Sequence, residues 1–119
     1  MYKYNSEDQK LVNKMMGMGF YISNNGFQYI MEAAKIINGC NSHPRMTGTG
    51  GIYDSIAKKF NTTSTRVERC IRTEIERYYS ARMDIPEALE CDMDSGKLTN
   101  TEFLARLTNI LYADEEILS

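Results

Sequence analysis

Residues 57–72 constrain the fold of this chain more than any other part of the sequence. They read Ala-Lys-Lys-Phe-Asn-Thr-Thr-Ser-Thr-Arg-Val-Glu-Arg-Cys-Ile-Arg, so a polar turn separates two stretches with helical apolar spacing. Asn61 lies in this turn, and Asn is among the few residues other than Gly that tolerate a positive φ. Thr62 or Thr63 can then cap the second helix through a hydroxyl. The pattern predicts a helix-turn-helix over about residues 52–80, a motif that binds DNA.

The second helix of this motif is expected over residues 64–80 and in the DNA major groove. At 100° per residue its buried stripe consists of Val67, Ile71, Ile75 and Tyr78. A recognition helix reads bases mainly with its N-terminal turns. Arginine can bond to O6 and N7 of guanine, and glutamate can accept a hydrogen bond from N4 of cytosine. The residues predicted to read bases are therefore Arg66, Glu68 and Arg69.

The other cations and hydroxyls of the motif are suited to DNA phosphates, which position a protein without revealing the base sequence. The residues predicted to contact the DNA backbone are Lys58, Lys59, Thr62, Thr63, Arg72 and Arg77. The plain alternative is that Glu68 and Arg72 form an ordinary ion pair one helical turn apart. Charged stretches are usually solvated helix faces, so both interpretations stay open.

The charge of the chain is unevenly distributed, although its net value is only −2. Residues 51–82 contain seven Lys or Arg against four Asp or Glu, whereas residues 83–119 contain two against nine. A basic patch on an acidic body can direct one face toward a phosphate backbone. The acidic part permits a second hypothesis, a protein-interaction module that modulates a full-length regulator or RNA polymerase without reading DNA. Asp92 and Asp94 would belong to its contact surface.

Apolar spacing is helical along nearly the whole chain, which predicts an all-α fold with six helices in a single domain spanning residues 1–119. The first four helices are expected to begin near residues 6, 26, 52 and 64. Asp84 should open a short fifth helix that carries Pro86 in its first turn. Thr99 and Glu102 have the spacing of a capping box and predict a last helix over about residues 100–112.

Other classes of protein are disfavoured. Three cysteines without a CxxC spacing indicate neither a disulfide framework nor a zinc ribbon, and Cys40 with His43 is too small a set for a metal site. One histidine and no nucleophile–base pair argue against an enzyme, and the glycine-rich residues 47–51 lack the ending of a P-loop. No cofactor is expected. Without a membrane span or a signal peptide, the protein is expected to be cytoplasmic.

Residues 53–72 resemble a segment of the C-terminal effector domain of the stage-zero sporulation protein A family, the response regulator that initiates endospore formation. Weaker similarity at residues 26–33 and 99–103 extends the resemblance over residues 17–111 in order. It implies a six-helix DNA-binding domain that reads short promoter boxes with a central C·G step. At the matching positions, Arg66, Glu68 and Arg69 would face the bases and Arg72 would contact the DNA beside them.

The resemblance also implies partners. Copies in this family associate head-to-tail on tandem sites through the last helix, which here would involve Phe103, Leu107 and Leu111. The same stripe is equally typical of the core face of a terminal helix. Contact with RNA polymerase is a further implication of the resemblance.

Two features depart from the family. Its members normally carry an N-terminal phosphoacceptor receiver, which these 119 residues lack. Switching by phospho-aspartate is therefore not carried over, and an excised domain and a standalone relative both stay open. Met1 followed by a capped helix suggests a natural start. The glycine-rich residues 47–51 replace a more apolar approach to the third helix.

Overall fold

The computed structural model describes residues 6–20, 25–40, 44–81, 85–90 and 98–113, and these are helical or irregular with no strand. The predicted all-α fold is confirmed. The elements are α1 (Ser6–Met18), α2 (Asn25–Asn38), α3 (Ile52–Lys59), α4 (Ser64–Ala81), the 3-10 turn η1 (Glu87–Leu89) and α5 (Asn100–Leu111).

The predicted fifth helix is only the three-residue turn η1, and Pro86 precedes it with an extended backbone rather than lying in its first turn. Two carbonyl groups of this turn are bound from other elements. Tyr79 donates its hydroxyl hydrogen to the carbonyl of Leu89, and Arg106 donates to the carbonyl of Ala88. These bonds take acceptors that a longer helix would use for its own N–H groups. Asp84 lies outside the described residues.

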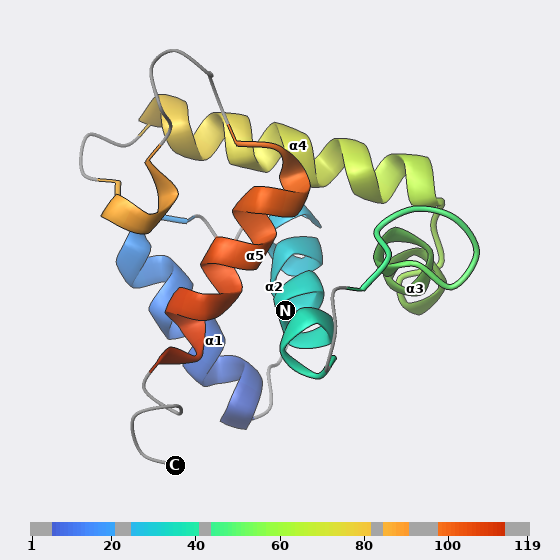
Figure 1. The fold of residues 1–119 in the computed structure, drawn as a ribbon, viewed down its shortest axis with the longest axis horizontal. Coiled ribbons are helices and arrows are strands. Elements are labelled where there is room, and N and C mark those ends of the chain that lie inside the picture. Colours follow the sequence, from blue (N-terminus) through green and yellow to red (C-terminus); the bar gives the residue numbers. More distant parts are fainter. Residues whose placement is uncertain (1–5, 21–24, 41–43, 82–84, 91–97, 114–119) are drawn as a thin grey trace.

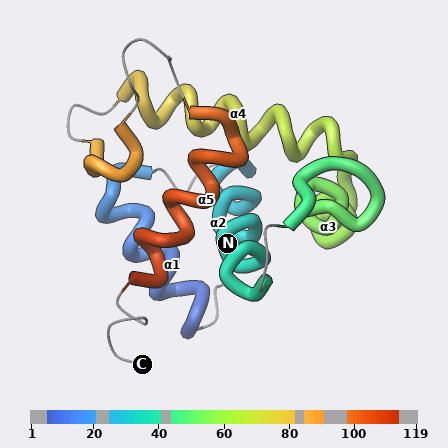
Figure 2. Tube along the Cα trace, viewed as in Figure 1, coloured from blue at the N-terminus to red at the C-terminus, as the bar shows by residue number. Residues whose placement is uncertain are grey.

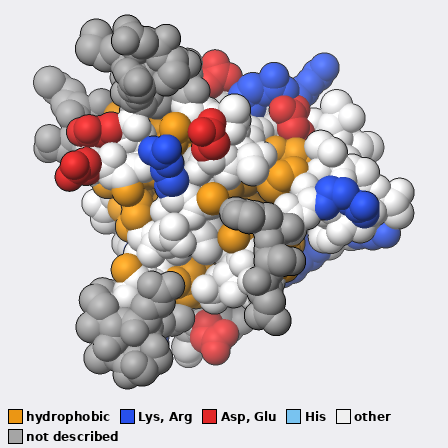
Figure 3. All heavy atoms as spheres, in the orientation of Figure 1, with side chains coloured by type: hydrophobic (Ala, Val, Ile, Leu, Met, Phe, Trp, Pro, Cys, Tyr) orange, Lys and Arg blue, Asp and Glu red, His pale blue; other side chains and the backbone are white. Residues whose placement is uncertain are grey.

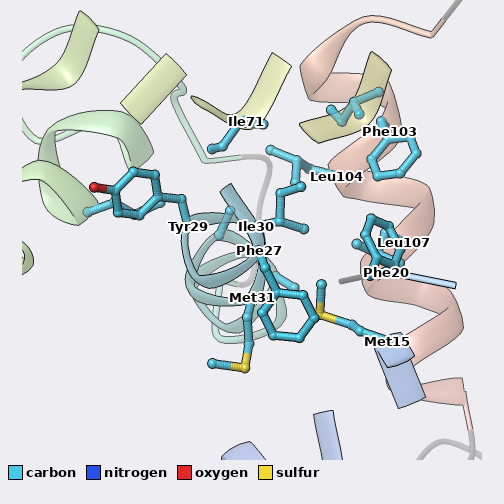
Figure 4. Packing of buried hydrophobic residues seen from close by; sticks show 14 of the residues in the cluster. Met15, Phe20, Phe27, Tyr29, Ile30, Met31, Ile71, Phe103, Leu104 and Leu107 are labelled. Carbon is cyan, nitrogen blue, oxygen red and sulfur yellow. The ribbon is translucent and has the colours of Figure 1, made fainter. Parts of the chain in front are cut away.

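Helix α2 lies at the centre and contacts α3, α4 and α5, as the ribbon in Figure 1 and the tube in Figure 2 show. Helix α4 crosses along one side, and α3 packs at its first turn. The buried side chains of α2 meet those of the surrounding helices in one core. Figure 4 shows the Phe27 ring beside Met15 of α1, with Met31 on the other side of the ring, and Leu104 of α5 next to Ile30. All five side chains are at most 1% exposed.

The turn between α3 and α4 has the conformation that its sequence predicts. Asn61 has φ 55°, the positive value that Asn tolerates. The N–H of Thr62 donates to the carbonyl of Ala57 at 2.8 Å, which closes the turn. Of the two candidate caps, Thr63 is the one whose hydroxyl accepts from the N–H of Arg66, at 3.2 Å. These local bonds set the direction in which α4 leaves α3.

The predicted stripe of α4 is buried: Val67, Ile71, Ile75 and Tyr78 are at most 3% exposed. Near the C-terminal end of the helix, the Tyr78 ring stacks on Phe20 with centroids 4.2 Å apart. Phe103 of α5 lies edge-on to both rings. The Tyr78 hydroxyl also donates to the carbonyl of Met18 at 3.0 Å. The far end of α4 is therefore tied to α5 and to the residues that end α1.

Candidate nucleic-acid interface

The first turns of α4 present two arginines on the side opposite the core. Arg66 and Arg69 are exposed, whereas Val67 between them is fully buried. No carboxylate among the described residues forms an ion pair with either guanidinium. The N-terminal end of α4 lies at the edge of the molecule (Figure 1). A planar guanidinium with no carboxylate to displace can bind the edge of a guanine or a phosphate.

Glu68 lies on the flank of the same turn and already has a partner. Its Oε2 accepts from Nη2 of Arg72 at 2.5 Å, with 31% and 54% of the two side chains exposed. This is the ion pair that the plain alternative predicts. Such a pair contributes only about 0.3–0.5 kcal/mol. A base or a phosphate can therefore replace either partner at little cost.

The remaining cations predicted to contact DNA each have a carboxylate partner. Arg77 donates to Glu74 at 2.7 Å, and Lys58 Nζ lies 3.3 Å from Asp54 within α3. Lys58 keeps 73% of its side chain exposed. Figure 3 shows Lys and Arg side chains gathered mainly over α3 and along the edge formed by α4.

Lys59 differs from the other predicted contacts because its partner belongs to another helix. Its Nζ lies 2.7 Å from Oε1 of Glu32, a residue of α2 with an 8% exposed side chain. The same carboxylate accepts from Lys35, which also pairs with Asp8 of α1 at 2.9 Å. Burial lowers the pKa of Lys35, but its hydrogen bonds to Asp8 and Glu32 outweigh this effect and raise the pKa above its ordinary value. Lys59 therefore joins α3 to α2 through a polar chain.

A second polar cluster, which the sequence patterns do not indicate, supports the first turns of α4. Asn100 at the start of α5 donates to the Tyr53 hydroxyl at 3.2 Å and to the carbonyl of Glu68 at 3.5 Å. Burial raises the pKa of the Tyr53 phenol. The cluster joins α3, α4 and α5 at the level of the predicted base-reading residues. Its members are 47 and 32 positions apart in the chain, so no local spacing reveals it.

The side chains predicted to mediate self-association lie in the core of the same chain. Phe103, Leu107 and Leu111 are 0% exposed. Helix α5 therefore uses this stripe as its core face. A second copy that docked on α5 would have to meet the exposed side, where Arg106 and Asn109 lie.

The loop before α3 holds a cation that the sequence interpretation missed. Arg45 is exposed, and its guanidinium donates to the carbonyl of Thr49. Thr62 and Thr63 flank the turn beside α4, and Thr63 is partly committed as the helix cap. Helical periodicity could not indicate a role for Arg45, because this residue lies in an irregular segment. Its position in the molecule follows only from how this loop folds.

Other sites can be assessed only over part of the chain. Within the described ranges, no three His, Cys, Asp or Glu side chains are placed to hold a metal ion. Cys40 is exposed there, whereas His43, Asp92 and Asp94 lie outside the described residues. The helices of the described part include none long and apolar enough to cross a bilayer.

The family model described as Sporulation initiation factor Spo0A C terminal matches residues 11–111. The match runs from α1 to the end of α5 and includes both helices of the helix-turn-helix. It confirms the resemblance inferred from the sequence. The chain therefore belongs to the family of the Spo0A C-terminal domain, which is a non-enzymatic, DNA-binding transcription activator domain.

Proposed function

We propose that this chain is a sequence-specific transcription regulator that reads double-stranded promoter DNA with α4 in the major groove. The observation that carries the proposal is the pair of exposed guanidinium groups of Arg66 and Arg69 near the N-terminal end of α4. Neither group has a carboxylate partner among the described residues. Glu68 completes the base-reading set. A regulator of this kind works where the promoters are, in the cytoplasm.

The backbone contacts divide into two groups. Lys58 and Arg72 are exposed, and each can exchange its partly exposed carboxylate neighbour for a phosphate. The hydroxyls of Thr62 and Thr63 lie in the turn between α3 and α4. Lys59 and Arg77 are bound to the buried carboxylates of Glu32 and Glu74, and we assign both cations to the stability of the fold. Phosphates then fix the register of α4, and bases determine which sites it selects.

Two copies could occupy tandem sites head-to-tail. Since the apolar stripe of α5 is buried, such a contact would use the exposed side of α5, which includes Arg106 and Asn109. An RNA polymerase contact is compatible with activation, and the family is one of transcription activator domains.

Selection of bound duplexes from a random pool tests the proposed function. The purified protein should enrich one short motif, and a variant with both Arg66→Ala and Arg69→Ala should lose that enrichment because both exposed side chains are removed without disturbing the core. A wild-type protein that binds all duplexes equally would refute specific reading. A protein that binds no DNA but captures a regulator or RNA polymerase would support the interaction-module hypothesis instead.

A further inference from the structure

The loop of residues 44–51 is ordered around the side chain of Arg45. The guanidinium donates from Nη2 to the carbonyl of Thr49. Gly48 and Gly50 have φ of +83° and +82°, and a Cβ built on Gly50 would lie 3.5 Å from Nη2. The guanidinium therefore rests against the backbone of the loop, and its position is set before any ligand arrives.

The base of this loop is joined to α3. The N–H of Ile52 donates to the carbonyl of Arg45 at 2.9 Å, and the N–H of Tyr53 donates to Met46 at 3.1 Å. A Cβ on Gly51 would approach the carbonyl oxygen of Thr47 to 2.7 Å, so only glycine permits this close packing. The loop and the first turn of α3 form one structural unit.

This unit lies beside the first turns of α4. Thr47 and Gly48 of the loop line a cavity of about 210 Å³ together with Ser64, Thr65 and Glu68 of α4. Figure 1 shows the loop curving around α3 next to the start of α4. The loop that carries Arg45 therefore flanks the predicted base-reading end of α4.

Arg45 resembles the two predicted base-reading arginines in its lack of an ion-pair partner. It has no carboxylate partner among the residues that the structure describes, as is true of Arg66 and Arg69. The exposed cations of α3 and the later turns of α4 are all paired. An unpaired guanidinium whose position is already fixed loses little conformational freedom when it binds an anion.

We propose that Arg45 binds a backbone phosphate of the duplex that α4 reads, so that residues 44–51 form a second DNA contact beside the helix-turn-helix. The inference rests on the proposed function. A helix with side chains is roughly 10–12 Å across, and the major groove is about 12 Å wide. A cation on the flank of a seated helix consequently lies at the level of the phosphates that border the groove. Its contact positions the protein and does not discriminate bases.

The test compares Arg45→Ala, Arg45→Lys and wild type in anisotropy titrations over a range of salt. Each neutralised phosphate contributes about 0.9 to the slope of log K against log salt. Loss of one contact should therefore weaken binding about 15-fold at ~0.05 M salt and about fivefold at ~0.15 M, equally for selected and scrambled duplexes. Arg45→Lys keeps the charge and should restore most of the slope. Lys10→Ala is the control, since it removes an exposed cation of α1, a helix outside the proposed DNA interface.

A second measurement uses the wild-type protein on duplexes with single neutral methylphosphonates. One neutralised phosphate at the edge of the binding site should reduce wild-type affinity and leave that of Arg45→Ala unchanged. The inference would be overturned if Arg45→Ala bound DNA as tightly as wild type at every salt concentration. It would also be overturned if the loss of affinity from Arg45→Ala and the loss from each methylphosphonate were additive at every position. Both outcomes leave the proposed function intact, whereas a wild-type protein without DNA affinity would refute that function itself. If Arg45→Ala unfolds, Arg45→Gln takes its place in both measurements, because it removes the charge and keeps a long polar side chain; Arg45→Gln that matches wild type at every salt concentration overturns the inference.

Discussion

Lys58 and Lys59 are adjacent in sequence, and the pattern of charges predicts the same role for both, but their side chains have different partners. Lys58 Nζ lies 3.3 Å from Asp54 on the same helix and is 73% exposed. Lys59 Nζ lies 2.7 Å from Glu32 on α2 and is 49% exposed. Replacing each lysine separately with alanine should therefore give opposite results in stability and in DNA binding.

The cost of Lys59→Ala can be bracketed from its surroundings. Exposed ion pairs contribute about 0.2–1 kcal/mol and broken buried pairs cost about 3–5 kcal/mol. This pair lies between these limits, because Glu32 is 8% exposed and Lys59 is half exposed. Lys35 still binds Glu32 at 3.2 Å after the change, which reduces the cost. We expect a loss of about 1–2 kcal/mol, which lowers Tm by about 4–8 °C in a chain of this size.

Thermal unfolding followed by circular dichroism and salt-dependent anisotropy measure the two effects. Lys58→Ala should leave Tm almost unchanged and reduce the slope of log K against log salt by about 0.9. Lys59→Ala should lower Tm and leave the slope unchanged. A double-mutant cycle with Glu32→Gln should give a coupling free energy of about 1 kcal/mol. If Lys59→Ala kept its Tm and lost as much salt dependence as Lys58→Ala, the assignment of Lys59 to the fold would be refuted.

Three further predictions concern the base-reading end and α5. Arg66→Ala should weaken binding to the selected duplex by about 1–3 kcal/mol and relax the preference at one base pair; anisotropy with duplexes changed at single pairs measures this, and equal losses on all duplexes would indicate a backbone contact. Leu107→Ala should lower the free energy of unfolding by about 2–5 kcal/mol because the side chain is completely buried; unchanged stability in urea denaturation, with pairing on tandem sites lost, would assign Leu107 to an interface. Hydrogen bonds from the N–H and hydroxyl of Thr99 hold the pKa of Glu102 below its ordinary value. The ionised carboxylate therefore stabilises the fold at pH values above that ordinary pKa. This contribution to stability disappears as the pH falls through the lowered pKa. Glu102→Gln should therefore narrow the difference in Tm between about pH 7 and pH 3, and an undiminished difference would contradict this sign.

Features that depend on neighbouring residues were predictable from the sequence. The positive φ of Asn61 and the cap provided by Thr63 depend on residues within one turn. The capping box of Thr99 and Glu102 forms as predicted, with the two side chains bonded to each other's N–H groups. The buried stripe of α4 follows from helical spacing alone.

Features that join distant segments were not predictable in this way. Glu32 is 27 positions from Lys59, so a charge count over α3 and α4 cannot reveal that this lysine already has a buried partner. The sequence overestimates the length of the fifth helix, because a proline such as Pro86 indicates where a helix can begin and not how long it is. The carbonyls of Leu89 and Ala88 are bound by Tyr79 and Arg106. The position of Arg45 beside α4 depends on how a glycine-rich loop folds, which periodicity does not describe.

The anchoring of α4 at both ends affects how a duplex must fit against it. The Tyr78–Phe20 stack holds the late turns, and Asn100 holds the carbonyl of Glu68 near the beginning. A tilt of α4 would break one of these two contacts, so we expect the DNA to deform more than the protein when they bind. Flexible pyrimidine–purine steps accommodate such distortion more readily than stiff A-tracts. We therefore expect the affinity for DNA to vary with base pairs that no side chain contacts, because α4 is held at both ends.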